Sequence, residues 1–407
     1  MASLGRTVRT MGALFFGMAL MFLGNGLLVS SASIQLKQLG FAELAIGVVN
    51  ASYFFGAILS TIFAHRIVSR VGHIRSFGIF TILFGISAMY HSMTGSIFVW
   101  ALLRFVVGFC YYALTMIIES WLNERTPNYL RSRVLAVYEV VFYLSFGFGV
   151  LLMSAQLENM QIFIIAASFI MVSSIPLNLI RIRQPKIPQR QALSLPKVFS
   201  VVPLALACAC VGGVVINGFF SMGGAFALSL GLSLKLAPVF MFVAMVGGFC
   251  GHFFIAPLSD KFGRRLAIIT VCVVSLIASA CFMIFSLDMV AIFVAGFFLG
   301  SGAFCLYALA LARANDVLND RSKSLEVGRA LLFSYLAGSL ASPVLLGTAM
   351  QLDGARGFMG IYVLLLALLL LFALTQKSVP QEKRQPWQPH TIRTTAIDEL
   401  SSKTQNG

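Results

Sequence analysis

The sequence predicts an all-α membrane protein with twelve transmembrane helices in two six-helix, pseudo-symmetric bundles. Of its 407 residues, 59% are hydrophobic and 11% are charged, whereas about a quarter of positions are charged in an average soluble domain. The hydrophobic residues also gather in long runs, and a helix of roughly 20 apolar residues crosses a bilayer core. Because the charges lie between these runs, most of the chain is expected to be embedded in lipid.

A hydropathy window of roughly 20 residues resolves the runs into twelve spans. They cover residues 10–33, 43–64, 76–92, 96–121, 133–154, 161–181, 200–226, 237–258, 266–286, 289–312, 328–350 and 357–375. The runs lack the alternating pattern of a membrane barrel, so helices are the structure that satisfies their backbone polar groups.

Lysine and arginine are distributed unevenly between the loops. The odd-numbered loops hold Lys37, Lys235 and Arg356, and Arg104 lies inside a span. The rest of the 29 basic residues lie in the N-terminus, the even-numbered loops and the C-terminal tail. Since basic loops stay on the cytoplasmic side, we expect a multi-pass protein of the bacterial inner (plasma) membrane with both termini in the cytoplasm.

The chain divides at a polar, proline-interrupted segment between spans six and seven. The predicted parts are an N-terminal bundle (1–181), a cytoplasmic linker (182–198), a C-terminal bundle (199–376) and a disordered polar tail (377–407). The halves are related, because Glu119-Ser-Trp-Leu-Asn-Glu-Arg-Thr follows span four and Asn315-Asp-Val-Leu-Asn-Asp-Arg-Ser follows span ten. Duplicated six-helix units are a transporter architecture with the site between the halves, near the bilayer midplane.

The turn between spans eight and nine reads Asp260-Lys261-Phe-Gly263-Arg264-Arg265. Asp260 can accept hydrogen bonds from a helix N-terminus, where the helix dipole is positive, and Gly263 permits a tight turn. The arginines can engage carboxylates or terminal carbonyls of a neighbouring helix. We therefore predict that these residues form a cytoplasmic gate; the alternative is that the cations only fix the topology.

The matching turn after span two also contributes Arg70 and Gly72 to the predicted gate, although Ser69 stands where the other turn has an acid. The turn at 260–265 resembles the loop signature of the major facilitator superfamily, which has an acid at the position of Ser69. Arg104-Phe-Val-Val-Gly108 in span four resembles the family's Arg-xxx-Gly motif.

Two further stretches resemble the YcaD-like branch of this superfamily, a group of bacterial transporters. They are Ile118-Glu-Ser-Trp-Leu and Ala330-Leu-Leu-Phe-Ser-Tyr-Leu-Ala-Gly-Ser-Leu. The resemblance covers residues 8–376 and implies the major facilitator fold and secondary transport.

Three ionisable residues, Arg104, Glu119 and Glu139, lie within predicted spans, all in the first half. Such residues normally face a cavity or a partner. Burial favours the protonated form of a carboxyl, so Glu139 can couple transport to protons, or it can be a structural hydrogen-bonding group. Glu119 can share that role or pair with Arg125 or Arg133. Arg104 can bind an anionic substrate group, relay protonation or brace the first helix.

Weaker polar signals mark further residues that could line a cavity, with helix packing as the alternative. These candidates are Asn25, Asn50, Tyr111, Tyr112, Tyr138, Asn217 and Tyr335. The seven cysteines all lie inside hydrophobic runs without the spacing of metal ligands, so no metal site is expected.

The sequence carries no P-loop, GxSxG or HExxH motif, so we expect neither an enzyme nor a cofactor. We predict a monomeric secondary active transporter that moves a small organic solute by alternating access, with protons and membrane lipid as further partners. No nucleic-acid partner is expected. Efflux is slightly favoured because the cavity candidates are aromatic with few fixed charges. The alternatives are a transport-inactive sensor or scaffold, and a lipid or lysolipid flippase.

Overall fold

The computed structural model describes residues 4–155, 157–179, 201–285, 288–318, 324–380 and 384. Within these residues the secondary structure is entirely helical. The helices of the first half are α1 (Leu4–Thr10), α2 (Gly12–Gln38), α3 (Glu43–Val71), α4 (His73–Tyr90), α5 (Ile97–Arg125), α6 (Arg131–Leu152), α7 (Asn159–Val172) and α8 (Ile175–Asn178). Those of the second half are α10 (Pro203–Ser229), α11 (Leu236–Phe262), α12 (Arg264–Ile284), α13 (Met289–Ala303), α14 (Leu306–Val317) and α15 (Ser324–Thr375).

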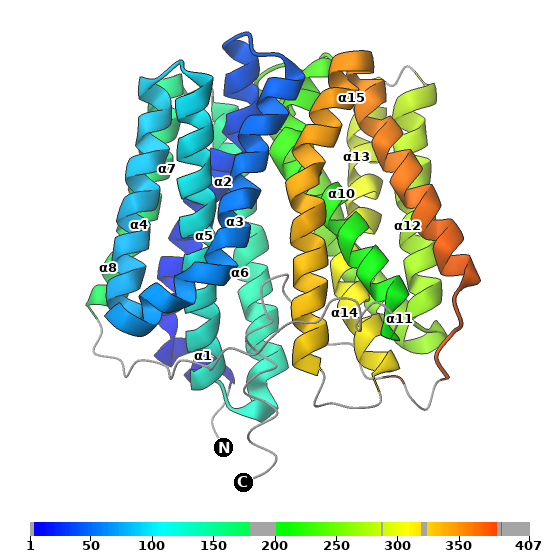
Figure 1. Ribbon diagram of the computed structural model, residues 1–407, viewed down its shortest axis with the longest axis horizontal. Helices are drawn as coiled ribbons and strands as arrows, with labels where there is room; N and C mark the ends of the chain where they lie inside the picture. The colour runs from blue at the N-terminus through cyan, green and yellow to red at the C-terminus, as the bar shows by residue number, and fades with distance from the viewer. Residues whose placement is uncertain are drawn as a thin grey trace.

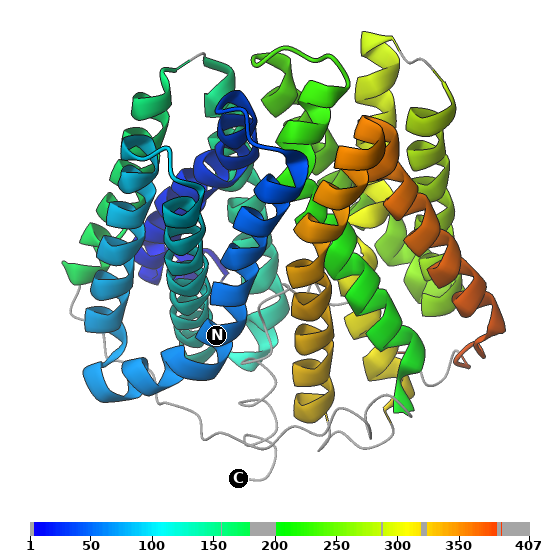
Figure 2. The ribbon, with the colours of Figure 1, turned by 45° about the horizontal axis from the view of Figure 1, so that its top comes forward.

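The described chain contains eleven segments long and apolar enough to cross a membrane, and the last of them supplies two crossings. α15 runs for 52 residues, but Asp353 and Gly354 have non-helical backbone angles and break it into two helices. The chain reverses at this break, and the second helix runs back from the top of Figure 1, slanting away from the first (Figures 1 and 2). The predicted all-α membrane fold with twelve crossings is therefore confirmed.

Hydrophobic side chains cover the outer surface of the bundle. On α4, Ile79, Ile82, Leu83 and Ile86 are 41–52% exposed. Their spacing places them on one helix face, away from the rest of the protein. An exposed apolar stripe of this kind is what a lipid-facing helix requires.

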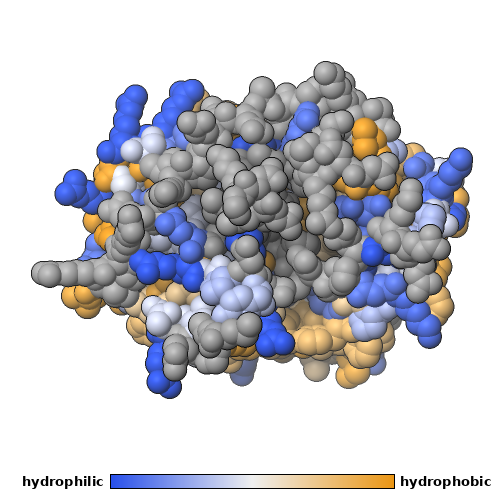
Figure 3. Space-filling view, turned by 90° about the horizontal axis from the view of Figure 1, so that it is seen from below, coloured by the Kyte–Doolittle hydropathy of each residue, from blue (hydrophilic) through white to orange (hydrophobic). Residues whose placement is uncertain are grey.

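The helices form two bundles that stand side by side, α1–α8 on the left and α10–α15 on the right of Figure 1. Helix α1 and the turn after α3 lie on one face, which we call the terminal face. The opposite face, here the loop face, carries the turns after α2, α10 and the first part of α15. Figure 3 looks onto the terminal face, where hydrophilic side chains cover much of the described surface.

Paired glycines bring helices into backbone contact in both halves. A Cβ atom on Gly26 of α2 would overlap the Phe146 carbonyl of α6, and one on Gly149 of α6 would overlap the Leu23 carbonyl of α2. The second half repeats this arrangement between α10 and α15. Small residues allow close helix packing in membranes. The two related halves therefore use the same kind of glycine contact to bring a pair of helices together.

The tenth crossing differs from the predicted span 289–312. It breaks at Phe304 and Cys305 between α13 and α14, and it continues to Val317. This extension places Arg313 and Asp316, 7% and 4% exposed, inside the bundle. Both charges belong to the second half, are buried within the protein near the terminal face, and were not among the three ionisable residues predicted within spans. The predicted linker 182–198 lies outside the described residues.

Candidate functional site

A cavity lies between the two bundles. Its volume, counted as the space that the centre of a water molecule can occupy, is about 80 Å³. A single water needs roughly 10–15 Å³ on this measure, so the cavity can hold a small molecule. Both halves line it with seventeen residues, ten of them aromatic. The aromatic residues are Tyr53, Phe54, Tyr111, Tyr112, Phe142, Tyr143, Phe146, Phe220, Phe304 and Tyr335.

Arg104 reaches this cavity from α5, and the glycine one turn later explains how. A Cβ atom on Gly108 would overlap the Tyr53 carbonyl of α3, so the glycine lets α3 and α5 approach closely. Arg104 Nη2 then donates to Asn50 Oδ1 at 2.8 Å. Its guanidinium carbon also lies 5.4 Å from the centre of the Tyr53 ring, within the range of a cation–π interaction. The described contacts of Arg104 are with Asn50 and Tyr53 of α3, the second crossing, rather than with the first helix.

Asn50 continues this contact into the second half. Its Nδ2 donates to the Ser221 carbonyl of α10 at 3.0 Å and lies 3.7 Å from the sulfur of Met222. Asn50 is fully buried, so both amide atoms are used away from water. A hydrogen-bonded chain from Arg104 through Asn50 to Ser221 therefore joins the two bundles.

Tyr111 and Tyr112, predicted to line a cavity, follow Arg104 two turns along α5 and do line the cavity. The Tyr53 ring lies 6.2 Å from that of Tyr111 and 6.4 Å from that of Tyr112. From the second half, the Phe220 ring lies 5.2 Å from that of Phe304. Aromatic rings thus enclose the cavity from both bundles.

The predicted asparagines of α2 and α10 both line the cavity. Asn25 is 1% exposed, and its Oδ1 has no hydrogen-bond partner among the described residues. Asn217 donates from Nδ2 to Ser339 Oγ of α15 at 2.7 Å. Tyr335 also lines the cavity, and its ring lies 4.6 Å from that of Tyr307 at a tilt of 57°. These side chains add polar groups to an otherwise aromatic surface.

The predicted carboxylates do not line the cavity directly. Glu119 of α5 is 1% exposed and accepts from the Tyr138 hydroxyl of α6 at 3.4 Å. Tyr138, predicted to line the cavity, is instead buried with its ring 5.9 Å from that of Phe22. Its hydroxyl is committed to Glu119, which explains why it faces the helix packing. Glu139 is half-buried one turn before Tyr143, a cavity-lining residue of the same helix.

A second polar group lies beside Tyr143, across the interface between the halves. His252 of α11 hydrogen-bonds through Nδ1 to the Gly248 carbonyl at 2.8 Å, and the sulfur of Cys305 lies 3.5 Å from the same nitrogen. The Tyr143 and His252 rings are 6.2 Å apart. The break after α13 places Cys305 here.

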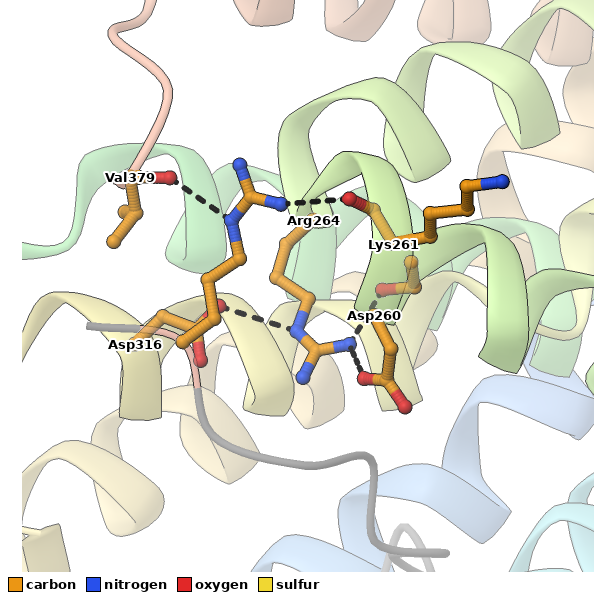
Figure 4. A network of polar contacts seen from close by, with 7 residues as sticks. Asp260, Lys261, Arg264, Asp316 and Val379 are labelled. Carbon is orange, nitrogen blue, oxygen red and sulfur yellow. Dashed lines mark hydrogen bonds and ion pairs between the residues drawn. The ribbon is translucent and has the colours of Figure 1, made fainter. Parts of the chain in front are cut away.

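At the terminal face, the predicted gate residues form a network within the second half (Figure 4). Arg264 Nη1 donates to Asp260 Oδ1 at 2.6 Å and to Ser259 Oγ at 2.8 Å, while Nε donates to Asp316 Oδ2 at 3.2 Å. The side chains of Arg264 and Asp316 are each 1% exposed, against 43% for Asp260. These described partners all belong to the second bundle.

The neighbouring Arg265 binds the end of the last crossing. It donates to the carbonyls of Ala373 and Leu374 at 2.9 and 2.6 Å, the helix-terminal contact that the sequence suggested. Lys261 lies over the Phe262 ring at 5.2 Å.

Beyond α15, the backbone returns to this network. Residues 376–380 with Arg384 are here called the C-terminal strap, and Arg384 contacts the α11–α12 turn. Arg384 donates to the carbonyls of Val379 and Lys261 at 3.0 and 3.1 Å (Figure 4). Arg313 donates to the Lys377 carbonyl at 2.5 Å. Part of the tail that was expected to be disordered therefore packs on the bundle; its residues 381–383 and 385–407 lie outside the described residues.

The turn after α3 shares only the backbone of this arrangement. Gly72 and Gly263 have φ of +90° and +98°, a region that favours glycine, and each separates two helices. In the first half, however, the Ser69 hydroxyl donates to the Arg66 carbonyl of its own helix at 2.9 Å, and Arg70 is exposed. Among the described residues no ion pair there corresponds to that of Arg264.

The two halves touch near the loop face. A Cβ atom on Gly47 of α3 would overlap the Pro343 carbonyl of α15, and one on Gly347 would lie 2.5 Å from the Glu43 carbonyl. On the other side of the interface, Gly147 of α6 packs against the Phe242 ring of α11. These positions lie in the halves of their helices nearer the loop face, which closes the bundles together there.

Most lining residues that sequence reasoning missed stand one turn from a residue that it identified. Tyr53 and Phe54 follow Asn50 on α3, and Phe220 and Ser221 follow Asn217 on α10. Helical spacing places such positions on one face, so extending each polar signal by one turn would have found them. Phe304 had no such signal, because it depends on the break between α13 and α14.

No cluster of three or more histidine, cysteine or acidic side chains suited to a metal ion occurs in the described part of the chain.

Comparison with known proteins confirms the predicted resemblance. The family model described as Major Facilitator Superfamily matches residues 14–341. The uncharacterized MFS-type transporter YcaD of Salmonella arizonae is 25% identical over 346 residues, which cover 84% of this chain and 89% of that protein. YcaD of Salmonella typhimurium is 26% identical over 341 residues, with coverage of 83% and 88%.

Solved transporter structures share the fold at lower identity. A bacterial homolog of the human lysosomal transporter Spinster, in an inward-facing and occupied conformation, has a TM-score of 0.72, 16% identity and coverage of 94% of this chain and 99% of its own. The nucleoside transporter NupG has a TM-score of 0.72, 13% identity and coverage of 89% and 96%. A D-xylose-proton symporter has a TM-score of 0.70, 15% identity and coverage of 92% and 98%. They confirm the two-bundle transporter fold.

Proposed function

This chain belongs to the major facilitator superfamily of secondary transporters, and from that premise we propose that it moves a small organic solute across the bacterial inner membrane by alternating access. The observation that carries the proposal is the cavity between the two bundles, lined by side chains of both. A site shared by two rigid halves can be exposed to either side when the halves rock. The chain is expected to work as a monomer in lipid, since the site lies within one chain.

We assign the described conformation to the state in which the cavity opens toward the terminal face. Support comes from the contacts of Gly47 and Gly347, which close the halves at the loop face, and from the contact between Asn50 and Ser221. Cysteines introduced at cavity positions should react with a membrane-impermeant maleimide from the terminal face alone. Equal labelling from both faces would contradict this assignment.

The terminal face is assigned to the cytoplasm because the basic residues gather there. Arg264, Arg265 and Arg313 lie at this face, while Lys37 and Lys235 lie at the other, and basic segments stay on the cytoplasmic side. Fusion of a periplasm-dependent reporter to the C-terminus tests this: the reporter should stay inactive, and an active one would reverse the orientation.

Proton coupling is assigned to Glu139 with support from its surroundings. The carboxyl stands one turn from Tyr143, whose ring faces His252 across the interface at 6.2 Å. A titratable group beside such a cavity can bind a proton in one state and release it in the other. Glu119, bound to Tyr138, is a second candidate. Arg104 is assigned to the solute rather than to the proton.

Proteoliposomes with an imposed pH gradient test the coupling. Solute movement should follow the gradient in the wild type, and Glu139→Gln should keep exchange of solute but lose the response to the gradient. Glu158→Gln, on the loop face at the start of α7, is the control. Solute movement that does not depend on the pH gradient, with Glu139→Gln behaving like the wild type, would contradict the proposal of proton coupling.

Efflux is the proposed direction, on the strength of ten aromatic residues and one charged residue in the described lining. Everted vesicles should then take up solute when energised, whereas right-side-out vesicles should exclude it. The reverse pattern would show uptake. Movement of labelled lipid instead of solute would identify a flippase, and failure to move either would favour a scaffold.

The Arg264 cluster is proposed to act in gating through the second half. Arg264 ties the α11–α12 turn to α14, so the turn and α14 move together. If so, Asp316→Asn should slow solute exchange more than it weakens solute binding. An equal loss of both would point to a purely structural role.

A further inference from the structure

Arg104 is a buried cation with unused hydrogen-bond donors. It is 1% exposed, and its Nε and Nη1 have no hydrogen-bond partner among the described residues. One neutral amide, Asn50, and one ring, Tyr53, are its described contacts. Burying an unpaired charge is costly, and buried charges are normally paired or bound to a ligand.

No described carboxylate neutralises this charge. Among the described residues that line the cavity, Arg104 is the one charged side chain. The comparison with Arg264 is informative, because that equally buried arginine is held by Asp260 and Asp316. Arg104 is therefore buried like Arg264 but lacks the two carboxylates that hold Arg264.

We propose that the cavity binds a monoanionic aromatic carboxylate, whose carboxylate accepts hydrogen bonds from the free N–H groups of Arg104. This inference rests on the proposed transport function and names its substrate class. The planar guanidinium suits a carboxylate, and a single cation balances a single negative charge. Tyr53, Tyr112 and Phe220 supply ring surfaces for an aromatic body, which prefers edge-on or offset ring contacts.

Asn25 adds a second feature of the ligand. Its Oδ1 is buried at the cavity without a hydrogen-bond partner among the described residues. A buried acceptor left without a donor is unfavourable. A hydroxyl or amine on the ring of the ligand satisfies it, so a hydroxybenzoate is expected to bind more tightly than benzoate.

Thermal unfolding of the purified full-length chain tests the proposal with matched probes. Benzoate, phenylacetate and 4-hydroxybenzoate are titrated against their neutral amides at constant ionic strength. The carboxylates should raise the Tm in a saturable way, and the amides should not. In Arg104→Gln the apparent affinity should fall by about tenfold or more, the loss expected for a hydrogen bond to a charged group. Arg104→Lys should keep part of the response.

Arg313→Gln is the matched control, since it removes another buried arginine, in the second bundle near the terminal face. It should keep the wild-type Tm response to the carboxylates, measured from its own baseline. The proposal is overturned if amides act like carboxylates, if no carboxylate raises the Tm, or if Arg104→Gln responds like the wild type. Should Arg104→Gln fail to fold, the test rests on two other results. These are the difference between carboxylates and amides in the wild type and the partial response of Arg104→Lys.

Transport is measured separately, so that the two proposals can fail independently. Binding that depends on Arg104, without movement of any solute in proteoliposomes, would contradict the transport function and leave the anion site standing. Movement of a neutral or cationic solute that benzoate does not inhibit, with Arg104→Gln fully active, would uphold transport and overturn the anion site.

Discussion

Arg104 and Asn50 form a 2.8 Å hydrogen bond at the cavity, between a buried cation and a buried amide. The same amide donates to the Ser221 carbonyl of the opposite bundle. The Asn50 side chain thus contacts both the cation at the site and the opposite bundle. A ligand that binds Arg104 is placed beside the contact that must break when the loop face opens.

The first prediction concerns the strength of this bond. In a double-mutant cycle of Asn50→Ala and Arg104→Met, we expect a coupling free energy of about 1.5–3 kcal/mol, because the acceptor serves a charged donor. Reversible unfolding in mixed micelles measures it. Ser52→Ala is the control: its hydroxyl bonds the Ala101 carbonyl at 2.7 Å between the same helices, and it should cost about 1 kcal/mol. A coupling near zero would mean that the bond is incidental.

The second prediction separates the two acids of Arg264. Asp316→Asn should destabilise the protein by about 3–5 kcal/mol, since it removes one partner of a buried pair. Asp260→Asn should cost about 0–1 kcal/mol, because that carboxylate is 43% exposed. Unfolding free energies of the two variants provide the measurement. If both variants lose the same stability, the difference in burial does not control the energetics of the cluster.

The third prediction tests the close approach of α3 and α5. Gly108→Ala should destabilise the protein and weaken any ligand response at Arg104, because the added Cβ would overlap the Tyr53 carbonyl. Gly78→Ala is the matched control within α4, with no atom within 4 Å of the added Cβ. It should be neutral or stabilise by about 0.5–1 kcal/mol, the usual gain from replacing a helical glycine. Similar Tm values for the two variants would contradict the packing argument.

The fourth prediction concerns the C-terminal strap. Arg384→Ala removes the hydrogen bonds to Val379 and Lys261, so a Val379→Cys reporter should react faster with maleimide. The expected increase is about two- to tenfold for each hydrogen bond lost. Ser378→Cys, at an exposed position, should change little, and no native cysteine among the seven is exposed. An unchanged rate at Val379 would show that Arg384 does not hold the strap.

Much of the candidate site was predictable because its signals are local. A charge or amide within a hydrophobic run is conspicuous, and Arg104, Asn25, Asn50 and Asn217 all line the cavity. Tyr138 shows the limit of such reasoning, because its orientation depends on Glu119 of another helix. Position along one helix does not determine which neighbour a side chain meets.

The twelve crossings, the two related halves and the family could be predicted from the sequence, because polar groups are costly in lipid and therefore fall between the apolar runs. The sequence also marked the turn glycines Gly72 and Gly263. The tertiary structure alone decided the partners: that Arg264 has two carboxylates while Arg104 has a neutral amide, and that Asn50 reaches across to Ser221. Such contacts join residues far apart in the chain, and only the packing of helices against one another brings them within hydrogen-bonding distance.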